Sequence, residues 1–221
     1  MDRRLFIGLA ALARGAGLAG PCVAETAQTT AEPGDMVMGS PKAPVTVIEY
    51  ASASCPHCAR FNNEIFPAFK AKYIDTGKVF YVFREFLTPP AEFAAVSFLI
   101  ARCAGKDKYF SVVDAVFHAQ AEIYETQDMK GHLLKIAAAA GLDEKAVNAC
   151  LADPAAIKAL NARVDHYVSR DGVNSTPTFL IGDQRLTGEQ TLASLDPAIA
   201  AAEDKAKPAA SRRAHHRKPH G

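Results

Sequence analysis

Apolar runs and alternating segments predict several strands in this chain. Residues 45–50 are almost continuously apolar, which is typical of a buried strand. Residues 78–86 are rich in Val, Phe and Tyr and partly alternate with polar residues, so they predict a second long strand. Residues 36–38 fit a short edge strand, which places three strands in the first half of the chain.

Helical spacing dominates most of the remaining sequence. Apolar residues recur three and four positions apart over 56–73, which predicts a helix directly after the first long strand. From 89 to 170 nearly every segment has a helical pattern, with a last helix at about 189–202. Breaks in the long helical block are expected at Gly105, Gly131, Gly141 and Pro154.

A hairpin separates the helical block from the last helix. Residues 178–181 and 184–187 flank Gly182-Asp183, which is the signal of a two-residue turn. The predicted order is therefore strand, helix, strand, helical block, hairpin and helix, and this order indicates an α/β fold.

The sequence Cys55-Pro56-His57-Cys58 stands where the strand 45–50 gives way to the helix 56–73. At a helix N-terminus, unpaired N–H groups and the helix dipole favour negative charge. The upstream thiol is therefore expected to ionise easily and to attack disulfides. We expect Cys55 to be the exposed nucleophile, Cys58 the buried resolving thiol, and His57 the side chain best placed to stabilise the Cys55 thiolate further.

Two other interpretations of the two-cysteine motif, a zinc site and a purely structural disulfide, have less support in the sequence. A zinc site usually needs four ligands, but no second pair of cysteines has this spacing, and His118 and His132 are scattered, so no metal site is predicted. A purely structural disulfide across four residues gains little from loop closure. The motif therefore indicates a redox-active dithiol.

Length and charge limit the possible functions. The chain has 221 residues, 49% of them hydrophobic, which suits one domain or one domain with an insertion. The formal net charge is +1, but residues 25–204 hold sixteen Lys and Arg against twenty-three Asp and Glu. This acidic body argues against nucleic-acid binding. The tail, 205–221, holds six Lys and Arg and little to bury, so we expect it to be disordered.

The first residues have the composition of an export signal. Arg3 and Arg4 precede an apolar stretch that ends in small residues before a cut after Ala24, so residues 1–24 are predicted to be removed. The signal fits either the general secretory or the twin-arginine route. Both routes lead to the periplasm, and residues 25–35 then form a linker.

Cysteine parity agrees with an oxidising compartment. Five cysteines are present, and the predicted cleavage removes Cys22. With Cys55 and Cys58 as the reactive pair, Cys103 and Cys150 are the candidates for a structural disulfide. Two buried free thiols are the alternative.

The Cys-Pro-His-Cys helix, the helical block and the segment Ser-Thr-Pro-Thr-Phe at 175–179 together resemble the DsbA family of exported thiol–disulfide oxidoreductases. The resemblance implies a thioredoxin-like fold with an inserted helical domain, over 36–204 with the insertion at about 89–165. It also implies that Thr176-Pro177 is a cis peptide lying against Cys55 and Cys58, and that Thr176 offers backbone groups to an extended substrate. An ordinary trans proline is the alternative.

The resemblance extends to Glu49, which takes the place of a buried acid beneath the redox pair. Strand alternation puts Val47 and Glu49 on one face. A buried carboxyl has a raised pKa and could exchange a proton with Cys58. The alternative is that Glu49 ends the strand in solvent.

The function implied is the introduction of disulfide bonds into reduced exported polypeptides, without a cofactor. A membrane reoxidant of the DsbB type is the expected partner. A monomer is expected because 25–35 is too short for an N-terminal dimerisation module. An exported reductase or isomerase, and a chaperone-like peptide-binding module, remain as alternatives.

Overall fold

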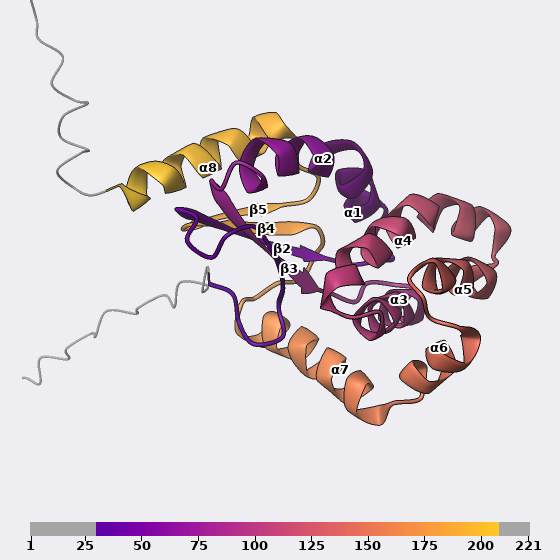
Figure 1. Ribbon diagram of the computed structural model, residues 1–221. Coiled ribbons are helices and arrows are strands. Elements are labelled where there is room, and N and C mark those ends of the chain that lie inside the picture. The colour runs from indigo at the N-terminus through magenta and orange to yellow at the C-terminus, as the bar shows by residue number, and fades with distance from the viewer. Residues whose placement is uncertain (1–29, 208–221) are drawn as a thin grey trace, which may run out of the picture.

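A five-stranded sheet with the order β1-β3-β2-β4-β5 forms the centre of the computed structural model, which describes residues 30–207 (Figure 1). The strands are β1 (Met36–Met38), β2 (Val45–Ala51), β3 (Val79–Glu85), β4 (Thr178–Ile181) and β5 (Gln184–Thr187). β2 and β3 pair in parallel, and the other neighbours are antiparallel. The α/β fold predicted from the pattern is confirmed.

The helix after β2 is present, but it is not a uniform α-helix. It consists of α1 (Pro56–Arg60), a π-helical turn η1 (Phe61–Ile65), α2 (Phe66–Phe69) and a second π-helical turn η2 (Lys70–Ile74). Pro67 has no N–H to donate to the preceding turn, and the helix widens just before it, where Phe66 N–H bonds to Phe61 O. This wider turn follows directly after the short helix that carries Cys58, and its Phe61 is buried.

The helical block begins and ends close to the predicted positions. It contains α3 (Ala91–Cys103), α4 (Lys106–Thr126), α5 (Met129–Ala139), α6 (Glu144–Leu151) and α7 (Pro154–Ser169). The predicted breaks at Gly105, Gly141 and Pro154 fall at helix ends. The break predicted at Gly131 is wrong. Gly131 lies inside α5, where its N–H bonds to the cap Asp128, and the chain turns instead at Gln127 with a positive φ of 58°.

The helices cover both faces of the sheet. α2 and α8 (Leu192–Ala206) pack on the face that carries Val47 and Phe179, while Tyr167 of α7 packs with Tyr50 on the other face (Figure 1). Helices α3 to α6 lie together beside the sheet (Figure 1). α8 begins later than predicted because Thr191 and Ser194 form a capping box. It runs on to Ala206, so the prediction of disorder from residue 205 is wrong for its first residues, and Lys205 pairs with Asp183.

Residues 30–35, predicted to belong to a linker, are tied to the sheet. Arg84 on β3 is fully buried, and its guanidinium contacts carboxylates of Glu32, Asp35 and Asp171 at 3.0–3.1 Å. A buried cation requires such partners, so this segment is needed by the folded body. Linker composition did not reveal this because the requirement comes from a residue far along the chain.

Neighbouring Glu85 faces the helical block instead. Its carboxylate accepts hydrogen bonds from Arg102 at 2.6 Å, Tyr109 at 2.9 Å and Arg163 at 2.8 Å. These contacts join β3 to three helices of the block. The chain also joins Cys103 of α3 to Cys150 of α6 by a disulfide, with Cα atoms 6.3 Å apart, a normal separation for such a bond.

The predicted signal, with Cys22, and most of the basic tail lie outside the described residues. Within 30–207, the helices are all too short or too polar to cross a membrane.

Candidate active site

Cys55 lies between the end of β2 and the start of α1. It is the N-cap residue, with extended backbone angles, and Pro56 follows at the first helical position, where a missing N–H costs nothing. Cys55 is 7% exposed and Cys58 is fully buried. Cys55 is therefore less exposed than predicted, although it is the more accessible cysteine of the pair.

The local contacts make the Cys55 thiol acidic. Its pKa is lowered to about 5, first by a hydrogen bond from the Cys58 thiol, then by the Thr176 hydroxyl and by backbone N–H groups of Cys58 and His57, while burial opposes the shift. His57 thus contributes through its backbone. The helix N-terminus supplies its donors directly to sulfur, as the motif predicted.

Cys58 has the opposite character. Burial is the main cause that raises its pKa well above the usual range, and the neighbouring Cys55 and Glu49 add to the rise. One thiol of the pair is therefore ionised at neutral pH while the other keeps its proton. This division of acidity is what a nucleophile and a resolving thiol require.

The loop before β4 lies against Cys55. The Thr176-Pro177 peptide is cis, and the Cys55 Sγ donates to the Thr176 carbonyl oxygen at 3.3 Å. The Thr176 hydroxyl is buried and has no hydrogen-bond partner in this state, so an ionised Cys55 gives it an acceptor. A second cis peptide, Pro89-Pro90, was not anticipated.

Glu49 is buried, with 3% of its surface exposed, so the alternative of a solvent-exposed strand end is wrong. Tyr81 donates a hydrogen bond to Glu49 Oε2 at 2.6 Å. The pKa of Glu49 is raised to about 8 because burial outweighs this hydrogen bond. The side chain is therefore a proton-carrying acid at neutral pH, electrostatically coupled to Cys58.

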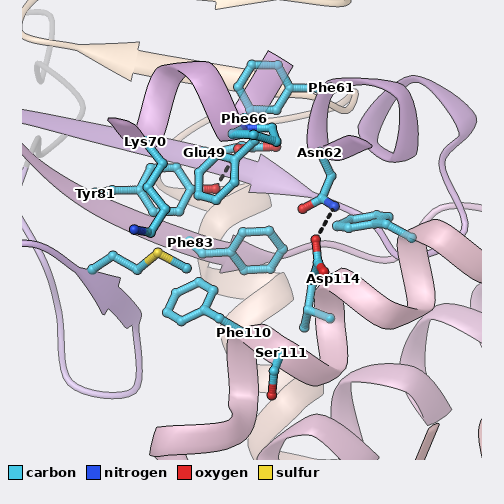
Figure 2. Close-up of a pocket in the computed structure, with 14 residues that line it drawn as sticks. Glu49, Phe61, Asn62, Phe66, Lys70, Tyr81, Phe83, Phe110, Ser111 and Asp114 are labelled. Carbon is cyan, nitrogen blue, oxygen red and sulfur yellow. Dashed lines mark hydrogen bonds between the residues drawn. The ribbon is translucent and has the colours of Figure 1, made fainter. Parts of the chain in front are cut away.

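Glu49 also lines a cavity of about 300 Å³ between the active-site helix, the sheet and α4 (Figure 2). Aromatic rings form most of its wall, and Asn62 and Asp114 meet at one side by a 2.9 Å hydrogen bond (Figure 2). The aromatic residues that line the cavity together with Glu49 are Phe61, Phe66, Tyr81, Phe83, Phe110 and Phe117. The buried acid thus faces a small, mainly apolar space, with the Asn62–Asp114 pair as a polar group in its wall.

Helix α4 of the insertion holds the loop that carries Cys55. Gln120 donates to the carbonyl oxygens of Ala53 at 2.7 Å and Cys55 at 3.3 Å, and Tyr124 donates to that of Ser54 at 2.8 Å. Sequence reasoning missed both side chains. Neither lies in a motif, and only the folded arrangement brings α4 to this loop.

A charged cluster on the other side of Cys55 was also missed. Glu189, in the loop after β5, binds the His57 imidazole and accepts two hydrogen bonds from Arg60 at 2.8 and 3.0 Å. The imidazole side chain is thus already paired. The described residues contain no group of three or more His, Cys, Asp or Glu placed to hold a metal ion.

Comparisons with known proteins agree with this geometry. A family model described as thioredoxin matches residues 31–201. A putative protein-disulfide oxidoreductase of Rickettsia bellii is 32% identical over 173 residues, which are 78% of this chain and 64% of the relative. The chain therefore spans less than two thirds of that relative.

Solved structures give the same result. The crystal structure of alpha-DsbA1 from Wolbachia pipientis superposes with a TM-score of 0.72 at 30% identity, covering 80% of this chain and 94% of the other. A protein-disulfide isomerase from Novosphingobium aromaticivorans superposes with a TM-score of 0.68 at 25% identity, covering 77% and 97%.

Proposed function

Because this chain belongs to the DsbA family of thiol–disulfide oxidoreductases, with a thioredoxin fold interrupted by a helical insertion, we propose that it introduces disulfide bonds into exported polypeptides through Cys55 and Cys58. The observation that carries this proposal is the opposed acidity of the two thiols. A stabilised Cys55 thiolate stabilises the reduced enzyme, which makes the oxidised enzyme a strong oxidant.

The proposed reaction has two exchange steps. A substrate thiolate attacks the Cys55 sulfur of the enzyme disulfide, forms a mixed disulfide, and releases Cys58 as a thiolate that takes up a proton. A second substrate thiolate then attacks the substrate sulfur, which forms the substrate disulfide and releases the Cys55 thiolate. Two electrons pass from the substrate to the enzyme.

Three neighbouring groups support these steps. Glu49 is the proposed proton donor to the Cys58 thiolate, because its pKa of about 8 keeps it protonated at neutral pH and its charge acts on Cys58. Thr176 and Pro177 form the edge along which an extended substrate would lie. His57 is proposed to add positive charge near the thiolate.

The setting of the reaction is part of the proposal. We place the protein in the periplasm as a monomer, with reduced exported polypeptides as substrates and a membrane oxidase of the DsbB type as the reoxidant. Residues 1–24 and the oxidising chemistry of the pair support this placement.

The test is the equilibrium of the Cys55–Cys58 pair with glutathione, combined with oxidation of a reduced peptide. An oxidase should have an equilibrium close to that of the strong periplasmic oxidants, while a value near thioredoxin would indicate a reductase. Cys58→Ser should accumulate mixed disulfides that reductant releases. If Cys55→Ser traps them instead, the roles of the two cysteines are reversed. Peptide binding without electron transfer would indicate the chaperone-like module.

A further inference from the structure

Glu189 connects the two halves of the candidate active site. Its carboxylate binds His57 and Arg60 of the active-site helix, and the preceding residue, Gly188, donates its N–H to the Pro177 carbonyl oxygen at 2.9 Å. One short loop therefore contacts both the Cys-Pro-His-Cys helix and the cis-proline loop. Since Thr176 of that loop contacts Cys55, the contacts form a closed ring around the reactive sulfur.

Positive charge near Cys55 affects the stability of the reduced enzyme but not that of the oxidised enzyme. The reduced enzyme has a thiolate at Cys55, and the oxidised enzyme has none. A cation that turns toward the thiolate therefore stabilises the reduced form alone. In the structure, however, the imidazole of His57 and the guanidinium of Arg60 are held by the Glu189 carboxylate. The carboxylate therefore competes with the thiolate for the Arg60 cation and for the His57 imidazole, which carries a charge only when it is protonated.

Few other charges face this cluster. A hollow of about 100 Å³ lies beside it, and its charged wall residues are His57, Arg60, Glu64 and Glu189. The side chains of His57 and Glu189 are 58% and 42% exposed. An exposed ion pair contributes little to the free energy of folding, so stability alone gives little reason for this arrangement.

We propose that Glu189 is a positioning residue that holds His57 and Arg60 toward the loop 188–191 and thereby limits how strongly this enzyme oxidises its substrates. The inference rests on the function proposed above. It assigns to the loop after β5 a role in setting the redox equilibrium, although the loop contributes no reacting atom.

The test measures Cys55 thiolate absorbance against pH and the glutathione equilibrium on Glu189→Gln. Releasing the His57 and Arg60 side chains should lower the thiolate pKa and shift the equilibrium about two- to fivefold toward the reduced enzyme, the effect of one exposed charge pair. The matched control is Asp183→Asn, which removes one exposed negative charge that is paired with Lys205 on α8. The control should leave both quantities unchanged.

A second variant tests the route through His57. In a His57→Ser background, Glu189→Gln should produce a clearly smaller shift than in the unchanged protein, because one of the two side chains that Glu189 holds is gone. An equal shift in both backgrounds would overturn the route through His57. A shift toward the oxidised enzyme, or no difference from Asp183→Asn, would overturn the proposal itself.

The proposal and the oxidase function fail in different ways. The difference between Glu189→Gln and the unchanged protein tests the role of Glu189, whatever the absolute equilibrium is. The absolute equilibrium of the unchanged protein tests whether the enzyme is an oxidase. Circular dichroism and thermal unfolding of each variant establish that the compared proteins are folded.

Discussion

Tyr81 donates its hydroxyl hydrogen to Glu49 Oε2 at 2.6 Å, in a place where both side chains are buried. This hydrogen bond favours the carboxylate, whereas burial favours the protonated acid, and burial has the larger effect. Tyr81 therefore keeps the pKa of Glu49 lower than burial alone would make it. The two residues come from neighbouring parallel strands, β2 and β3.

Glu49→Gln should make the protein more stable at neutral pH. The folded carboxyl has a pKa of about 8 against 4.5 for the free group, so the unfolded chain loses this proton first as pH rises. The folded state therefore loses up to about 1.4 kcal/mol of stability per pH unit between 4.5 and 8, and glutamine removes this loss. Denaturant unfolding of both proteins at several pH values, in the same redox state, measures it. Parallel pH profiles would contradict the raised pKa.

Tyr81→Phe should raise the pKa of Glu49 above about 8, because only the hydrogen bond that favours the carboxylate is removed. The titration of the Glu49 carboxyl, followed by infrared difference spectroscopy against Glu49→Gln, measures the shift. A lower pKa in Tyr81→Phe would mean that the hydroxyl does not act on the carboxylate as described.

Thr176→Val should raise the pKa of Cys55 by about one unit, since it removes a hydroxyl that donates to the thiolate. The enzyme should become a weaker oxidant by the equivalent tenfold change in its glutathione equilibrium. Thr176→Ser keeps the hydroxyl and serves as the control. Titration of the thiolate absorbance gives the Cys55 pKa of the three proteins. Equal pKa values would show that the Thr176 hydroxyl does not stabilise the thiolate.

His57→Ser should also raise the pKa of Cys55 and weaken the oxidant, with the two changes moving together at about 30 mV per pKa unit. The change should be modest, because the imidazole is paired with Glu189, and larger in a Glu189→Gln background. Thiolate titration and the glutathione equilibrium on the same samples measure both. An unchanged pKa would assign thiolate stabilisation to Cys58, Thr176 and the helix N-terminus.

The Cys103–Cys150 bond should be found intact by non-reducing peptide mapping of protein from an oxidising compartment. Replacing both residues with Ala should cost about 3–4 kcal/mol of unfolding free energy, the value expected for a loop of this length. The pKa of Cys55 should stay the same, which separates a structural bond from a redox one. Two free thiols beside an oxidised Cys55–Cys58 pair would refute the bond.

The residues that sequence analysis found share one property, which is that a local pattern marks them. Cys55 and Cys58 stand at a strand–helix boundary, and Pro177 precedes a strand with turn signals after it. Glu49 was placed by strand alternation together with a family resemblance. These positions are defined by neighbours in the chain, so a single sequence can reveal them.

The residues that it missed depend on contacts between distant segments. Gln120 and Tyr124 look like ordinary helix residues until α4 reaches the loop before Cys55. Glu32 and Asp35 look like linker residues until Arg84 is buried beside them. Glu189 precedes a helix and gives no sign of its contact with His57. No local pattern encodes these approaches.

The pairing of β2 with β4 across the insertion has a consequence for how the enzyme matures. The contact between Cys55 and Thr176 joins residues 121 positions apart, so a large loop must close, at a cost in chain entropy, before the contact can form. A partly folded chain therefore has the Cys-Pro-His-Cys sequence without the Thr176 groups that lower the pKa of Cys55. The low pKa of Cys55 therefore depends on this contact, so the reactivity of Cys55 during refolding would report when the two segments come together.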